Sequence, residues 1–122
     1  MPIIDIELVC ESEAEFAKVS AQTLADAIGQ ALNSAPSRTW VRLRFLNRIS
    51  YAENLSSLES AELPAFVTVL QAHPPVGAAL AAEIMAVTMA VARCLALTPE
   101  RVHVQYAPPA VGRQAFGGKL VT

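Results

Sequence analysis

The stretches MPIIDIELV (residues 1–9) and LPAFVTVLQ (residues 63–71) open the two halves of the chain with one pattern, a proline followed by a hydrophobic run. Proline offers no N–H to a sheet ladder and is tolerated at the first residue of a strand. In the first run Ile4, Ile6 and Leu8 alternate onto one face, with the period of two that is typical of a strand. We therefore expect strands over residues 2–9 and 63–71.

A helix and a second strand are expected to follow in the first half. Hydrophobic residues recur at helical spacing over residues 14–33, and Ser12 with Glu15 has the capping-box spacing that begins a helix. Residues 39–46 (TWVRLRFL) alternate again and predict a strand. The polar, turn-rich stretch 47–62 predicts a long loop with a short helical turn.

The second half repeats this order at an offset of about 62 residues. Residues 76–97 predict a helix, residues 101–106 (RVHVQY) a strand, and Gly117-Gly118 a tight turn in the tail. Two such β-α-β repeats, about 1–62 and 63–122, predict one α+β domain over residues 1–122. It would hold a four-stranded mixed sheet with both helices on one face, the strands of each unit being parallel.

Composition excludes several classes of function. At 53% hydrophobic and 16% charged residues the chain is more apolar than an average domain, so we expect subunit contacts to cover part of its surface. A net charge of −2 argues against a nucleic-acid partner. Glu83 and Arg93 interrupt the most hydrophobic segment, which therefore predicts a buried helix and no membrane partner. Cys10 and Cys94 lack metal or redox spacing, and no signal peptide is evident, so we expect free thiols and a cytoplasmic location.

Pro2 is the first candidate for chemistry. Initiator methionine is usually removed before proline, which would leave Pro2 as a free secondary amine at the start of a strand. An α-amino group titrates near pH 7.7–8.0, and nearby cations or partial desolvation lower that value. A base whose pKa lies near ambient pH suits general acid–base catalysis. Pro64 holds the same place in the second half, but its nitrogen is a tertiary amide and cannot be a base. A simple strand start is the alternative reading of Pro2.

The MPII start, the two-unit length and the ending RVHVQYAPPAVGRQAFGGKL together resemble the tautomerase superfamily. Its members include 4-oxalocrotonate tautomerase, carboxymethyl-hydroxymuconate isomerase, macrophage migration inhibitory factor and haloacrylate dehalogenases. The resemblance implies a homotrimer with no cofactor, in which Pro2 moves a proton between an enol oxygen and a carbon. It also implies a small anionic substrate, a 2-keto or 2-hydroxydienoate carboxylic acid of the kind met in aromatic degradation.

Carboxylate binding calls for arginine forks. Arg42 and Arg44 share a strand face with Trp40, and Arg113 precedes the Gly-Gly turn. The alternative for Arg42 and Arg44 is a solvated or subunit-interface strand face, and the alternative for Trp40 is packing. Arg38 and Arg101 hold corresponding places in the repeat, which indicates a structural or interface role instead.

Tyr106 ends the fourth strand, where the resemblance implies a phenol that donates to a substrate oxygen; packing on the sheet is the alternative. His103 stands where the short tautomerases carry a carboxylate-binding arginine, although a buried or interface histidine fits equally. His73 and Phe116 are weaker candidates for a site, as a loop histidine and a packing aromatic. The region Val9-Cys10-Glu11-Ser12 lacks the arginine that oxalocrotonate enzymes carry there, which puts 4-oxalocrotonate itself in doubt.

Three functions remain open. The first is a cofactor-independent tautomerase. The second is a hydrolytic dehalogenase or a decarboxylase of an acrylate-like acid. In that case the loop 51–54 would cover the pocket and Glu53 would orient a water. The third is a trimeric binding protein of the same fold without chemistry.

Overall fold

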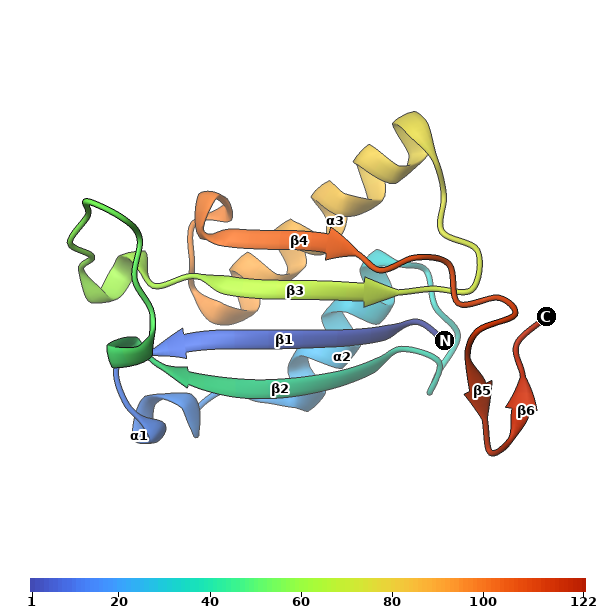
Figure 1. Ribbon diagram of the computed structural model, residues 1–122, viewed down its shortest axis with the longest axis horizontal. Coiled ribbons are helices and arrows are strands. Elements are labelled where there is room, and N and C mark those ends of the chain that lie inside the picture. The colour runs from blue at the N-terminus through green and yellow to red at the C-terminus, as the bar shows by residue number, and fades with distance from the viewer.

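The computed structural model describes residues 1–122 as one four-stranded mixed sheet with helices packed against it (Figure 1). The sheet order is β2-β1-β3-β4, and a separate two-stranded hairpin, β5-β6, closes the chain. The elements are β1 (Ile3–Cys10), α1 (Glu13–Phe16), α2 (Ala21–Ala31), β2 (Trp40–Asn47), β3 (Ala65–Leu70), α3 (Gly77–Leu95), β4 (Val102–Tyr106), β5 (Ala115–Phe116) and β6 (Lys119–Leu120). Short 3-10 turns lie at Arg48–Ser50, Ser60–Glu62 and Pro99–Arg101.

The pairing of the strands confirms the two β-α-β units. β1 runs parallel to β2 and β3 runs parallel to β4, while β1 and β3 join the units through an antiparallel ladder. In that ladder Ile3 lies opposite Leu70 and Ile4 opposite Val69. The sheet is therefore mixed, and the α+β class expected from the repeat is confirmed.

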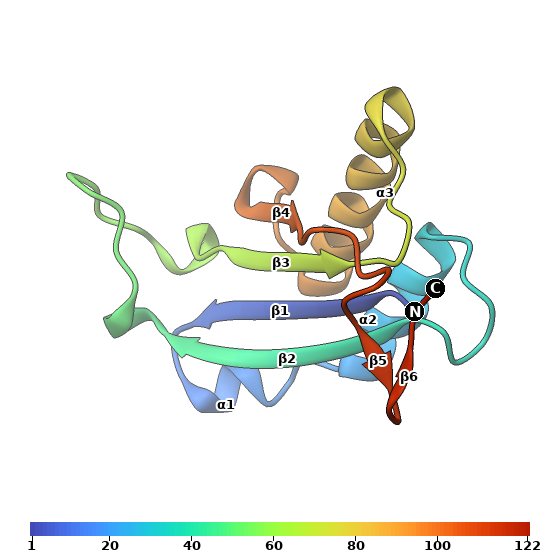
Figure 2. The same cartoon turned by 45° about the vertical axis from the view of Figure 1, so that its right-hand side comes forward.

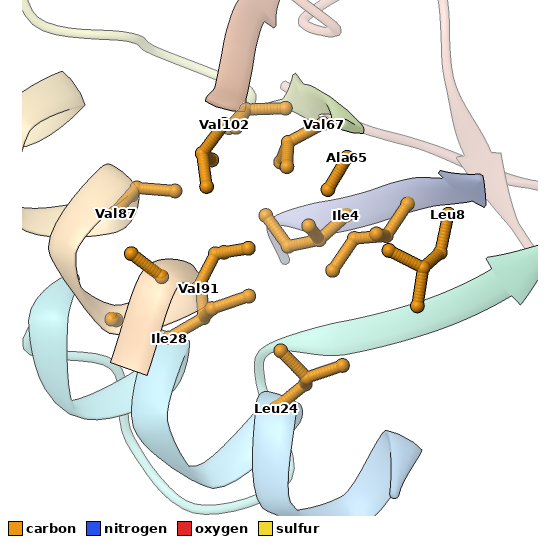
Figure 3. Close-up of a cluster of buried hydrophobic side chains, with 13 residues drawn as sticks. Ile4, Leu8, Leu24, Ile28, Ala65, Val67, Val87, Val91 and Val102 are labelled. Atoms are coloured by element: carbon orange, nitrogen blue, oxygen red, sulfur yellow. The ribbon is translucent and has the colours of Figure 1, made fainter. Parts of the chain in front are cut away.

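One face of the sheet carries the core, because the strand residues alternate between apolar and polar. Ile4 and Ile6 of β1 pack with Val67 and Val69 of β3 in a single cluster of 13 buried side chains (Figure 3). Leu24 and Ile28 of α2 and Val87, Ala90, Val91 and Ala92 of α3 belong to the same cluster, so both long helices cover one face. Fully burying one such Ile, Leu or Val side chain contributes about 1.5–3 kcal/mol.

The single helix expected over residues 14–33 is wrong, because the chain forms two helices there. Ser12 Oγ accepts the Glu15 N–H at 3.2 Å and starts α1, as expected. Ser20 Oγ then accepts the Thr23 N–H at 3.0 Å and starts α2 with a second cap. Serine favours the cap position over a helix interior, since its hydroxyl replaces a missing backbone partner.

α3 is buried over its second half only. Its length and hydropathy alone would allow it to cross a membrane, yet only 22% of its most apolar window is buried within the chain. Met85 is 60% exposed and Met89 37% exposed. The expected buried helix is thus realised at the C-terminal half, where the helix joins the core. Cys10 and Cys94 are free, as expected.

One edge of the sheet gathers the segments that matter for a site. β1 and β2 start at this edge while β3 and β4 end there, and the β5-β6 hairpin and both chain termini lie beside it (Figures 1 and 2). The loop containing residues 51–59 lies at the opposite edge (Figure 1).

Candidate active site

Pro2 begins the first ladder of the sheet. It is buried, and its carbonyl accepts the Trp40 N–H at 3.1 Å, which aligns the starts of β1 and β2. Pro64 begins the second unit, but its carbonyl accepts the Val9 N–H of β1 at 3.1 Å, across the antiparallel junction between the units. The two prolines therefore both precede a strand and bond different neighbours.

A cavity of about 420 Å³ opens at Pro2, and we call it the Pro2 cavity. Its polar lining comes from the segment after α2 and from the end of β3, and consists of Ser34, Arg38, Gln71 and His73. This volume lies within the range of small-molecule sites. The cavity sits at the edge where a free N-terminal amine would be.

Arg38 and His73 are the two side chains of the Pro2 cavity that can carry positive charge. Three other arginines are paired with carboxylates of the chain, Arg42 with Asp5, Arg48 with Glu11 and Arg101 with Glu53. Arg38 makes no ion pair, so its guanidinium is available to an anion. Arg38 therefore lines the cavity, whereas the sequence predicted a structural or interface role for it. Arg101 is paired with Glu53 of the same chain.

Gln71 also lines the Pro2 cavity, and the oxygen of its side-chain amide has no hydrogen-bond partner. Its Oε1 is buried and has no hydrogen-bond partner, while its backbone carbonyl accepts the Ala110 N–H at 2.8 Å. An unpaired buried acceptor costs about 1–3 kcal/mol. The sequence did not single out Gln71, and it assigned Arg38 a structural or interface role; Gln71 follows Leu70, which is opposite Ile3 in the antiparallel ladder.

Trp40 and the C-terminal hairpin border this edge on the helix-free side of the sheet. The ring of Phe116 meets the Trp40 indole edge-on at a centroid distance of 5.0 Å, and Trp40 Nε1 donates to the Ser37 carbonyl at 2.9 Å. Arg113 lies exposed in the turn before the hairpin. The structure thus brings Trp40, Phe116 and Arg113 to the same end as Pro2, with Arg113 outside the lining of the cavity.

Tyr106 lies at this end too, on the helix-covered face. Its hydroxyl donates to the Glu83 carboxylate of α3, and burial together with that carboxylate raises the pKa of the phenol well above its usual range. Tyr106 therefore remains a neutral donor at any ordinary pH, and in this chain its proton is directed to Glu83.

Arg42 and Arg44 lie on the helix-free face, away from the Pro2 cavity. The Arg42 guanidinium donates two hydrogen bonds, of 2.6 and 2.8 Å, to the Asp5 carboxylate. These bonds lower the pKa of the Asp5 carboxyl. Arg44 is opposite Glu7 and lines a hollow of about 310 Å³ on that face. Glu7 is five residues along β1 from Pro2, roughly 16 Å at 3.3 Å per residue.

His103 and Glu53 lie still further from the Pro2 cavity of their own chain. His103 is opposite Phe66, which is in turn opposite Glu7, and its ring stacks on Phe66 at 5.4 Å. Glu53 Oε2 accepts from Tyr51 at 2.7 Å and from Arg101 at 2.5 Å. The loop 51–54 therefore does not cover Pro2 of its own chain, contrary to the role considered for it.

Comparison with known proteins defines the fold. Neither the known family models nor the curated proteins include a match to this sequence. Among solved structures, Pt0534 inactivated by 2-oxo-3-pentynoate is similar with a TM-score of 0.74 at 17% identity, covering 97% of this chain and 94% of that one. A wild-type fused 4-OT asymmetric trimer gives 0.73 at 15% identity over the same shares, 97% and 94%. FG41 malonate semialdehyde decarboxylase inhibited by 3-bromopropiolate gives 0.67 at 15% identity over 94% and 90%.

The chain has the fold of the tautomerase superfamily. Each likeness spans nearly all of both chains and so includes both β-α-β units. The resemblance inferred from the MPII start and the ending is confirmed at the level of fold.

In this tautomerase fold the predicted site residues form two groups. Pro2, Trp40, Tyr106 and Arg113 lie at one edge of the sheet. Arg44 and His103 lie along the helix-free face, with Arg42 between the two groups. The chemistry open to the first group is proton transfer by an amine beside an anion site made by Arg38 and His73.

Proposed function

We propose that this protein is a cofactor-independent tautomerase in which Pro2, freed by removal of Met1, is the general base. The substrate class is a small 2-keto or 2-hydroxydienoate acid, and the isomerisation is a keto-enol conversion. The observation that carries the proposal is the Pro2 cavity itself, where the unpaired guanidinium of Arg38 lies in the same lining as Pro2.

The proton balance of this reaction needs only the amine. The neutral Pro2 nitrogen takes the proton from the enol hydroxyl of the substrate, and the resulting ammonium returns a proton to a carbon of the dienoate. Arg38 binds the substrate carboxylate and also disfavours the ammonium form, so we expect the pKa of Pro2 to lie below the usual 7.7–8.0. The ring fixes the nitrogen relative to the substrate, because proline holds its own backbone rigid.

The first test replaces the amine. In Pro2→Ala the terminal amine becomes primary and flexible, so kcat/KM for ketonisation of the enol form of phenylpyruvate or of 2-hydroxymuconate should fall about 10²–10⁴-fold. Pro64→Ala is the matched control, since Pro64 occupies the equivalent strand start without a titratable nitrogen, and it should keep wild-type turnover. Unchanged turnover in Pro2→Ala would exclude the mechanism.

A chemical probe gives an independent reading of the same amine. Pt0534 has been crystallised after inactivation by 2-oxo-3-pentynoate, so this acid is a suitable reagent. A reactive Pro2 should add across the alkyne, and peptide mapping should find one adduct, on the N-terminal peptide. Intact mass separates the binding-protein alternative, because a retained Met1 leaves no amine at Pro2.

A hydrolytic dehalogenase or decarboxylase of an acrylate-like acid is the second candidate, favoured by the likeness to malonate semialdehyde decarboxylase. In that reaction Pro2 would act as an acid and a carboxylate would activate water. Glu53, the acid considered for that role, is held by Arg101 and Tyr51 at the far edge of its own chain. Selective loss of such an activity in Glu53→Gln would therefore also require that Glu53 come from a neighbouring chain.

We also propose that the protein is a homotrimer, for which the trimers described for fused 4-OT are the support. Trimerisation would place the helix-free sheet face of one chain against its neighbours and bring the second group of residues within reach of another chain's Pro2.

A further inference from the structure

Gln71 is a polar side chain that the proposed mechanism leaves without a role. Its Oε1 is buried with no hydrogen-bond partner, although Gln71 lines the Pro2 cavity. The unsatisfied state is found in the chain that still carries Met1, where the Pro2 nitrogen is a tertiary amide with no hydrogen to donate. Buried polar groups normally have a hydrogen-bond partner, so an unpaired acceptor that lines a cavity indicates a missing donor.

The register of the sheet places that donor. Ile3 lies opposite Leu70 and Ile4 opposite Val69, so continuing this register by one residue beyond the last ladder pair sets Pro2 opposite Gln71. Directly opposed residues of an antiparallel pair have Cβ atoms about 4.5–5.5 Å apart on one face. By the alternation of the two strands, Pro2 and Gln71 fall on the face of Ile4 and Val69, whose side chains belong to the helix-covered core, and both residues line the Pro2 cavity.

We infer that Gln71 is a positioning residue for Pro2, whose amide oxygen accepts an N–H of the amine created when Met1 is removed. The bond would turn the nitrogen lone pair toward the open part of the Pro2 cavity, where Arg38 and His73 lie. Because the bond is stronger to the ammonium than to the neutral amine, Gln71 raises the pKa of Pro2 and opposes the lowering by Arg38. This inference rests on the proposed function, since it concerns the same amine.

Few other charges border the nitrogen. Arg38 and His73 are the cationic groups in the lining of the Pro2 cavity. On the helix side at this end, Glu83 is bound by the Tyr106 hydroxyl, and Asp5 on the opposite face is paired with Arg42. Arg113 and Lys119 belong to the tail and lie outside the lining.

The experiment titrates Pro2 directly by ¹⁵N NMR of protein labelled with ¹⁵N-proline, in which one secondary amine stands apart from tertiary amides. In Gln71→Met, which keeps side-chain length without the amide, the pKa of Pro2 should fall by about one pH unit. In Gln71→Glu it should rise above the wild-type value. Gln22→Met is the matched control, because Gln22 is exposed on α2, where its amide donates to Asp26 at 2.8 Å, and it should leave the titration unchanged.

Kinetics supply the second readout. With phenylpyruvate, Gln71→Met should lower kcat about tenfold with little change in KM, since a misplaced base loses turnover rather than binding. An unaltered Pro2 titration in both Gln71 variants would overturn the inference, even where Pro2→Ala abolishes activity. A shifted titration in a protein without tautomerase activity would support the inference and overturn only the proposed function. Retention of Met1 would overturn both.

Discussion

Arg38 is the residue on which the proposed substrate class depends most, because its guanidinium makes no ion pair and lines the Pro2 cavity. Of the arginines that the sequence favoured for carboxylate binding, Arg42, Arg44 and Arg113, the first is already paired with Asp5. Under the proposed function, one unpaired guanidinium in the lining of the Pro2 cavity suits a monocarboxylate better than a dicarboxylate. This agrees with the absence of an arginine just beyond the first strand.

Replacing Arg38 should separate its two effects. Arg38→Gln should raise KM for phenylpyruvate about tenfold or more, because a charged hydrogen bond to the carboxylate is lost. The pH profile of kcat/KM should shift upward, since removing a cation allows the Pro2 ammonium to form more readily. Arg38→Lys should keep the pH profile and lose part of the affinity, because it retains charge without the fork.

Arg93→Gln is the charge-matched control, as Arg93 is exposed on α3 and makes no ion pair. Equal effects of Arg93→Gln and Arg38→Gln would show that net charge, rather than the position of Arg38, governs binding.

At the residue scale, the sequence could identify Pro2 but not its neighbours. Pro2 is recognisable from its position alone, whereas Arg38 and Gln71 become neighbours of Pro2 only through folding. Arg38 is 36 positions from Pro2 and Gln71 is 69, so neither belongs to a local motif. The pairing register between β1 and β3 determines that Gln71 comes close to Pro2. The sequence repeat predicts the two strands but does not specify which of their residues lie opposite each other.

The strands were the most predictable elements. Each expected strand of the sheet lies within two residues of its observed bounds, because alternation of buried and exposed residues is a period-two signal that tertiary contacts reinforce. The helix over residues 14–33 was not predicted correctly, since Phe16 and Val19 pack on the core from α1 and the following turn and so imitate the spacing of one continuous helix.

The Asp5–Arg42 ion pair, which joins β1 to β2, predicts that the free energy of unfolding falls in acid. Arg42 lowers the pKa of Asp5 below its ordinary 3.8, so the pair stabilises the folded chain above that value. That contribution should disappear as pH falls through the lowered folded pKa. In urea unfolding from pH 7 to pH 2, Asp5→Asn should be less stable than wild type at pH 7, and the two should converge at the acid end.

Glu7→Gln is the control for this pair, because Glu7 lies on the same face of β1 without an ion-pair partner. Parallel pH curves for wild type and Asp5→Asn, with no convergence, would contradict the assignment of the acid loss to this pair.

The whole molecule has two surfaces that a monomer leaves open. The helix-free sheet face combines the exposed Trp40, 43% accessible, with the Asp5–Arg42 pair and the Thr68–Gln105 bond. This face is therefore more polar than the apolar surface that we expected subunit contacts to cover. The first half of α3 is the more apolar of the two, with Met85 exposed.

A homotrimer predicts a particular mass and a particular pattern of complementation. Sedimentation should give about three times the chain mass of 13.0 kDa. If His103 serves a neighbour's Pro2, the inactive variants Pro2→Ala and His103→Ala should restore activity when refolded together, with about one quarter of the sites holding both native residues. Recovery should be absent when either variant is refolded alone.

A trimer whose mixed variants stay inactive would show that His103 serves no neighbouring site, and a monomeric mass would exclude the assembly altogether.

Both ends of the polypeptide lie at the end of the sheet where β1 begins (Figure 1), and this has a practical consequence for anyone who purifies the protein. An affinity tag placed before Pro2 would convert its amine into an amide and silence the chemistry, while leaving a well-folded sample. A tag after Thr122 would leave the amine free but would start at the same end of the sheet, so a cleavable linker at that end is the safer choice.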